Sequence, residues 1–134
     1  MHPKDLKYSP CHLWLKSEND GLYRLGITYY YQEKIKSIVF LELPGAGTSL
    51  TLGEPFGAME SSKISSDIIS PLTGSVVSVN ASVVQKPGLV NKDPYGEGWL
   101  MVVRPSKPGE LSLLLSADEY LAAASSDTGG GQCF

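Results

Sequence analysis

Short stretches rich in β-branched and aromatic residues recur along the chain, and most of them end at glycine, proline or an Asp-Gly pair. Such side chains pack well on a pleated surface, so these stretches favour strands. Alternation of apolar and polar residues at the end of Leu6–Lys16 predicts the first strand, and Asp20-Gly21 predicts the tight turn after it. Many short strands separated by turns predict a mainly β fold, either a sandwich or a barrel.

The remaining strand-like stretches are spread over the whole chain, at Leu22–Ile27, Lys36–Leu43, Ser49–Leu52, Ser75–Val79 and Trp99–Val103. Between the last two, Asn80–Pro94 is expected to be rich in loops. Near the C-terminus, Leu111–Leu115 carries leucines at helical spacing. Ser116–Glu119 then has the S-x-x-E pattern of a capping box, so we expect C-terminal helices.

A chain of 134 residues is most simply one domain, with a core that needs no disulfide. We expect this domain to span residues 1–124 and the glycine-rich residues 125–134 to form a flexible tail. The net charge of −3 and the lack of a basic patch argue against nucleic-acid binding. No run of about 18 apolar residues and no signal-peptide core is present, so neither a membrane span nor secretion is expected. These features predict a cytoplasmic monomer.

The two cysteines, Cys11 and Cys133, lie near opposite ends of the chain and form no C-x-x-C or zinc-ligand pattern. Because cytosolic disulfides are disfavoured, we expect both to be thiols and the fold to be independent of them. The two histidines, His2 and His12, both lie near the N-terminus, with no Ser-His-Asp order beside them. The sequence therefore predicts neither a catalytic residue nor a metal site.

The stretch Gly53–Gly74 has the pattern of a strand, a tight turn and a returning strand. Ser61-Ser62 is typical of a turn, because small hydroxyls hydrogen-bond the local backbone. Lys63 stands at the apex and is the only cation between Lys36 and Lys86. A lysine at a hairpin tip is presented to solvent, where another enzyme can reach and modify it.

Residues of this hairpin follow the pattern FG-x-x-E-S-x-K-x-x-S-D-x-x-S-P-x-x-G, which resembles the lipoyl-attachment site of the glycine-cleavage H protein family. The residues in register are Phe56, Gly57, Glu60, Ser61, Lys63, Ser66, Asp67, Ser70, Pro71 and Gly74. Three further blocks fall in the order of that family, at Gly26–Thr28, Ile38–Pro44 and Asn91–Leu100. The resemblance covers about residues 6–123, and several blocks in order are far more specific than one motif.

The resemblance implies a lipoyl-domain-type flattened β-barrel or sandwich with a short internal helix. Thr28 is a suitable N-cap for that helix, although the tyrosines that follow it are poor helix formers. It also implies a carrier rather than an enzyme, with lipoate joined to Lys63 by an amide that a lipoate ligase or lipoyltransferase makes. Glu60, Ser61 and Asp67 would then position the arm or be recognised by that enzyme. The alternative for Glu60 and Asp67 is that they are ordinary solvated charges of the hairpin.

The sequence departs from the family near the N-terminus. The family typically places a carboxylate directly before the tryptophan of this block, where it is thought to hold the amine of the aminomethyl-loaded arm. Here Leu13 precedes Trp14, and Cys11 replaces a small hydroxyl residue. A leucine cannot accept a hydrogen bond from an ammonium, whereas a thiol beside the arm suits sulfur exchange. Both residues are thus possible contacts of the arm; the alternatives are that they simply fill the core.

These departures favour the H-like lipoate-binding proteins of heterodisulfide-reductase-like sulfur oxidation, which hold sulfur intermediates for a heterodisulfide-reductase-like complex. The first alternative is the glycine-cleavage carrier, which shuttles an aminomethyl group from glycine decarboxylase to aminomethyltransferase and is reoxidised by dihydrolipoyl dehydrogenase. The second alternative is a binding or lipoyl-relay protein that is not lipoylated.

Overall fold

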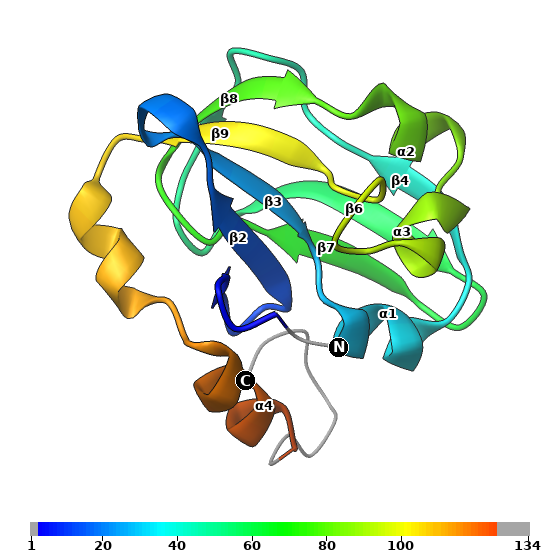
Figure 1. Cartoon of the computed structure of the whole chain (residues 1–134). Coiled ribbons are helices and arrows are strands. Elements are labelled where there is room, and N and C mark those ends of the chain that lie inside the picture. The colour runs from blue at the N-terminus through cyan, green and yellow to red at the C-terminus, as the bar shows by residue number, and fades with distance from the viewer. Residues whose placement is uncertain (1–2, 126–134) are drawn as a thin grey trace.

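The structure is a computed structural model that describes residues 3–125, with two antiparallel sheets as its main layers (Figure 1). One sheet has the strand order β1-β2-β3-β9-β8-β5, and the other has the order β4-β6-β7. The strands of the first sheet are β1 (Lys7–Tyr8), β2 (Leu13–Ser17), β3 (Tyr23–Ile27), β9 (Met101–Pro105), β8 (Gly74–Val79) and β5 (Ser49–Leu50). Those of the second are β4 (Ile38–Glu42), β6 (Pro55–Ser61) and β7 (Ser65–Ile69). The predicted mainly β fold is confirmed.

Local sequence signals explain several of the turns and helix ends. Asp20 and Gly21 have φ values of 61° and 74°, so the Asp-Gly pair makes the left-handed turn between β2 and β3 as predicted. Helix α1 (Tyr29–Ile35) begins at Thr28, whose Oγ1 accepts a hydrogen bond from the Tyr31 backbone N–H at 3.2 Å. At the start of α4 (Ala117–Ser125), Ser116 and Glu119 exchange the two side-chain-to-backbone hydrogen bonds of a capping box.

Two expectations about the secondary structure need correction. Asn80–Pro94 is not mainly loop, because it contains α2 (Ala81–Gln85) and α3 (Gly88–Lys92); the Asn80 side chain caps the first of them. Leu111–Leu115 is not α-helical: a 3₁₀ turn over Pro108–Leu113 ends there. Leu115 instead forms an isolated bridge with Tyr8, donating and accepting a backbone hydrogen bond, and this pairing prevents the helix from continuing.

Most of the core lies between the two sheets. Its buried residues come from both layers, for example Leu25, Leu41, Met59, Ile68 and Val103. A second cluster packs Tyr8 and Trp14 against Tyr120 of α4, with the two tyrosine rings stacked at 5.1 Å. Gly26 opposite Trp14 is required, because a Cβ there would lie 2.3 Å from the indole ring. Within residues 3–125 no helix is long and apolar enough to cross a membrane.

The expectation that both cysteines are thiols is wrong for Cys11, which is disulfide-bonded. The expectation rested on the redox compartment alone, an argument that contains no geometry. Cys133, the only other cysteine of the chain, lies outside the described residues, as do residues 126–134 of the predicted tail.

Candidate functional site

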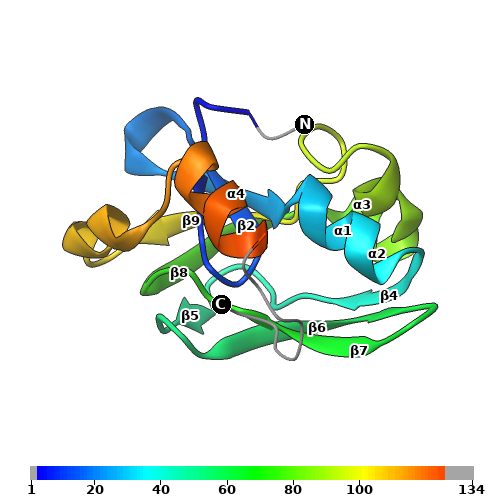
Figure 2. The same ribbon diagram turned by 90° about the horizontal axis from the view of Figure 1, so that it is seen from below.

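The hairpin of β6 and β7 presents Lys63 at one end of the molecule, on the side where α1, α2 and α3 lie (Figure 2). Ser61 shapes the turn: its Oγ accepts hydrogen bonds from the backbone N–H groups of Lys63 (3.2 Å) and Ile64 (3.1 Å). The Ser61 N–H also donates to the Ile64 carbonyl at 2.8 Å. The Lys63 side chain is exposed, and its amine makes no hydrogen bond or ion pair with any described residue. The backbone of the apex is therefore fixed while its amine stays accessible.

The hairpin tip is also tied to the rest of the protein. The Ser62 N–H donates to the Ser37 carbonyl at 2.9 Å, just after α1. Lys36, directly before it, has φ 67° and ψ −149°, a conformation that favours glycine. Asn91 of α3 stabilises this junction, because its amide donates to the Lys36 carbonyl (2.8 Å) and accepts from the Ile38 N–H (2.9 Å). Sequence reasoning placed Asn91 in a family block but missed this supporting role.

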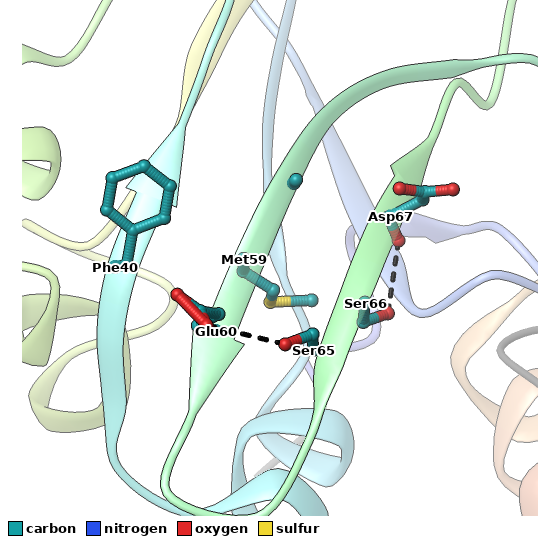
Figure 3. A pocket seen from close by; sticks show the side chains of 7 residues that line it. Phe40, Met59, Glu60, Ser65, Ser66 and Asp67 are labelled. Carbon is teal, nitrogen blue, oxygen red and sulfur yellow. Dashed lines mark hydrogen bonds between the residues drawn. The ribbon is translucent and has the colours of Figure 1, made fainter.

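Two carboxylates, Glu60 and Asp67, flank a hollow of about 470 Å³ on the sheet face beside the apex (Figure 3). Register places Glu60 opposite Ser65, and the Ser65 hydroxyl donates to Glu60 Oε2 at 3.5 Å. Asp67 lies opposite Ala58, one repeat further from the turn. The structure thus brings together the hairpin residues that the sequence singled out, namely Glu60, Ser61, Lys63 and Asp67.

A buried polar cluster lies behind the hairpin. Tyr31 of α1, 5 % exposed, shares a hydrogen bond with the Ser66 hydroxyl at 3.1 Å, and the His12 ring stacks on Tyr31 at 4.5 Å. His12 Nδ1 lies 2.7 Å from the Tyr120 hydroxyl, which lies 2.8 Å from Thr28 Oγ1. Burial raises the pKa of Tyr120 far above its ordinary value, so this hydroxyl stays protonated. No sequence signal marked this cluster, since its members are far apart along the chain.

Comparison with known proteins gives a consistent result. The family described as Glycine cleavage H-protein matches residues 6–127. The chain belongs to the glycine cleavage H-protein family. It is 48 % identical over 119 residues to the glycine cleavage system H protein of Carboxydothermus hydrogenoformans, covering 88 % of this chain and 90 % of that protein. The mitochondrial H protein of Pisum sativum is 46 % identical over 115 residues, covering 86 % and 69 % of the two chains.

A solved structure supports the same conclusion. The crystal structure of an H protein from Mycobacterium marinum superposes with a TM-score of 0.84 at 38 % identity, covering 92 % of this chain and 98 % of that one. H proteins of glycine cleavage carry lipoate covalently on a lysine and are carrier subunits rather than enzymes. The present chain fits the group: Lys63 is accessible, and its turn is held by backbone and Ser61 contacts that amide formation at the side chain would leave in place.

The two residues at which this chain departs from the family pattern do not lie at the hairpin. Leu13 is 1 % exposed, lies opposite Ile27 on β3 and belongs to the main core. Cys11 borders a separate apolar cavity of about 240 Å³ with Ile69, at the end of β7 far from Lys63. The sequence-based hypothesis that Cys11 and Leu13 contact the arm is therefore not supported by their positions.

Proposed function

We propose that the chain is the lipoyl carrier of a glycine cleavage system, with lipoate joined by an amide to Nζ of Lys63. The observation that carries the proposal is the accessible Lys63 at a fixed hairpin apex, in the register of the family pattern. The lipoyl group supplies a dithiolane whose sulfurs can be reduced and can carry an aminomethyl group between enzymes. The amide removes the positive charge of the lysine.

The comparisons favour glycine cleavage over the sulfur-oxidation role that the sequence alone favoured. The relatives described above bear the name of glycine cleavage H protein, and none of those names refers to sulfur oxidation. The sulfur-oxidation hypothesis depended on a thiol at Cys11 and on Leu13 beside the arm. Cys11 is instead disulfide-bonded and Leu13 is in the core, so both supporting arguments are lost.

Glu60 and Asp67 are proposed to serve the arm directly. An aminomethyl group carries an ammonium, and Leu13 offers no acceptor for it. The carboxylates of Glu60 and Asp67 are on the face next to Lys63, where a charge-assisted hydrogen bond is worth about 1.5–3 kcal/mol. The proposed partners are a lipoate ligase or lipoyltransferase, glycine decarboxylase, aminomethyltransferase and dihydrolipoyl dehydrogenase. The cytoplasmic location and the single domain over residues 1–124 stay predictions.

Intact mass spectrometry tests the attachment. Protein incubated with a lipoate ligase, ATP and lipoate is expected to gain one lipoyl increment, and Lys63→Arg is expected to gain none. Lys86→Arg is the matched control, an exposed lysine at the end of α2 that should keep the increment. An increment that persists in Lys63→Arg would refute the assignment, and no increment in the wild type would favour the relay protein that is not lipoylated.

Glycine–bicarbonate exchange tests the pathway. The lipoylated protein is expected to support the exchange with glycine decarboxylase, and Glu60→Gln with Asp67→Asn is expected to weaken it. Failure of the fully lipoylated wild type, together with sulfur loading from a persulfide donor, would restore the sulfur-oxidation role.

A further inference from the structure

Two consecutive side chains of β4, Val39 and Phe40, both face away from the core. They are 63 % and 50 % exposed, although neighbouring residues of a regular strand point to opposite faces. The cause is a break in register between Ile38 and Phe40 in the pairing with β6, which is the mark of a β-bulge. A bulge of this kind redirects side chains, and here it places an aromatic ring on the outer face of the three-stranded sheet.

The Phe40 ring forms a wall of the hollow beside the hairpin apex (Figure 3). Phe40 lies opposite Glu60, which lies opposite Ser65, so the three residues form one row across the strands. Lys63 is three residues beyond Glu60, which at the rise of a strand is about 10 Å. An extended lipoyl-lysine is long enough to bring its ring to this row. Ala58, on the same face as Glu60, completes the apolar part of the lining.

The opposite side of the hairpin is closed to such a ring. Tyr31 occupies the space between α1 and β7, hydrogen-bonded to Ser66, and it is itself covered by the His12 ring. Leu13 is packed in the core behind them. Within residues 3–125, the hollow at Phe40 is therefore the recess that an arm on Lys63 meets first.

We propose that the dithiolane ring of the arm rests in this hollow with a face or edge of the Phe40 ring against its sulfurs. The inference depends on the proposed lipoylation of Lys63. Sulfur next to an aromatic ring is a favourable contact, and Ala58 provides apolar surface beside it. The carboxylates of Glu60 and Asp67 at the rim disfavour thiolate anions. The hollow therefore suits the neutral dithiolane ring.

Two measurements on the lipoylated protein test whether the dithiolane rests against Phe40 in this hollow. In NMR spectra, the Phe40 ring protons are expected to shift on lipoylation and to show nuclear Overhauser effects to the dithiolane. In a kinetic assay, a phosphine is expected to reduce the dithiolane about two- to tenfold faster in Phe40→Ala than in the wild type, because the shielding contact is lost. Phe40→Tyr keeps the ring and should keep the wild-type rate. Val77→Ala truncates another exposed apolar residue, on β8, and should leave the rate unchanged.

The outcomes separate this inference from the proposed function. Mass spectrometry first establishes that each variant carries one lipoyl group. A wild type without that group would refute the carrier assignment itself. A lipoylated wild type with no Phe40 contact, and a Phe40→Ala reduction rate equal to that of Val77→Ala, would overturn the proposed contact with Phe40 and leave the carrier assignment in place. A Phe40→Ala variant that is lipoylated slowly but reduced at the normal rate would also overturn the proposed contact, and would make Phe40 a contact of the modifying enzyme.

Discussion

Leu13→Glu restores the carboxylate that the family pattern places before the tryptophan, and its effect decides whether this position serves the arm or the core. The sequence alone predicts a better glycine-cleavage carrier from this change. The structure predicts the reverse, because Leu13 is 1 % exposed among core residues and lies opposite Ile27. A carboxylate at this position has to be buried without a cation beside it, whichever role the arm plays.

The loss of folding stability expected for Leu13→Glu has two contributions. Deleting most of a buried leucine side chain costs about 2–5 kcal/mol, which Leu13→Ala measures by itself. Burial of an unpaired carboxylate adds several kcal/mol when the group is ionised. Such burial raises the carboxyl pKa in the folded state above its unfolded value of about 4.3. The extra cost is therefore absent below pH 4.3 and grows as pH rises toward the folded-state pKa.

Urea unfolding followed by tryptophan fluorescence at pH 4 and pH 7.5 measures both contributions. Leu13→Glu is expected to be less stable than Leu13→Ala at pH 7.5 and to approach it at pH 4. Leu13→Met, which conserves volume, is expected to lose less than about 1.5 kcal/mol at either pH. A Leu13→Glu variant as stable as the wild type at pH 7.5, with faster glycine–bicarbonate exchange, would refute the burial argument and show that position 13 contacts the arm.

Three other predictions concern the scaffold. Lys36→Gly is expected to raise the free energy of unfolding by about 1 kcal/mol, because φ 67° and ψ −149° suit glycine; a lower urea midpoint would contradict this. The free energy of unfolding is expected to fall as pH rises above 10, because burial raises the pKa of Tyr8, Tyr95 and Tyr120 above the ordinary 10.0 and the folded state keeps these hydroxyls neutral. Urea titrations at pH 8 and pH 11 should show a smaller loss of stability in Tyr120→Phe than in the wild type, and an equal loss would argue against this reasoning. In denaturant without reductant, Cys11 is expected to resist alkylation and, after reduction, to react, because it is disulfide-bonded. Peptide mass spectrometry that finds Cys11 alkylated before reduction would show that the bond does not form.

The parts of the fold that could be predicted from sequence are those governed by local chemistry. The Asp20-Gly21 turn, the Thr28 N-cap and the Ser116–Glu119 capping box were confirmed, because each depends on residues a few positions apart. Strand positions were also confirmed in outline, although their ends moved by a few residues. The Ser61 turn at the apex followed from the same kind of signal.

Features that depend on distant contacts could not be predicted. Leu111–Leu115 has helical spacing, but pairing of Leu115 with Tyr8 decides its conformation. Leu13 looked like an arm contact because the family pattern gives a position and no side-chain direction; its burial is set by β3 and the core. His12 and Tyr120 meet across the whole length of the chain, and no local pattern indicates such a contact.

The pairing of the first strands with the last ones constrains how the chain folds during synthesis. β3 pairs with β9, and Tyr8 pairs with Leu115, so the N-terminal strands cannot complete their pairing until these much later segments have been synthesised. Long-range pairing of this kind is slow and leaves β3 as an open edge in a nascent chain. The β6–β7 hairpin pairs locally, but its tip is also held by the Ser37 carbonyl and by the hydrogen bond between Tyr31 and Ser66. A modifying enzyme that requires the fixed tip would therefore act only after α1 has packed against the hairpin.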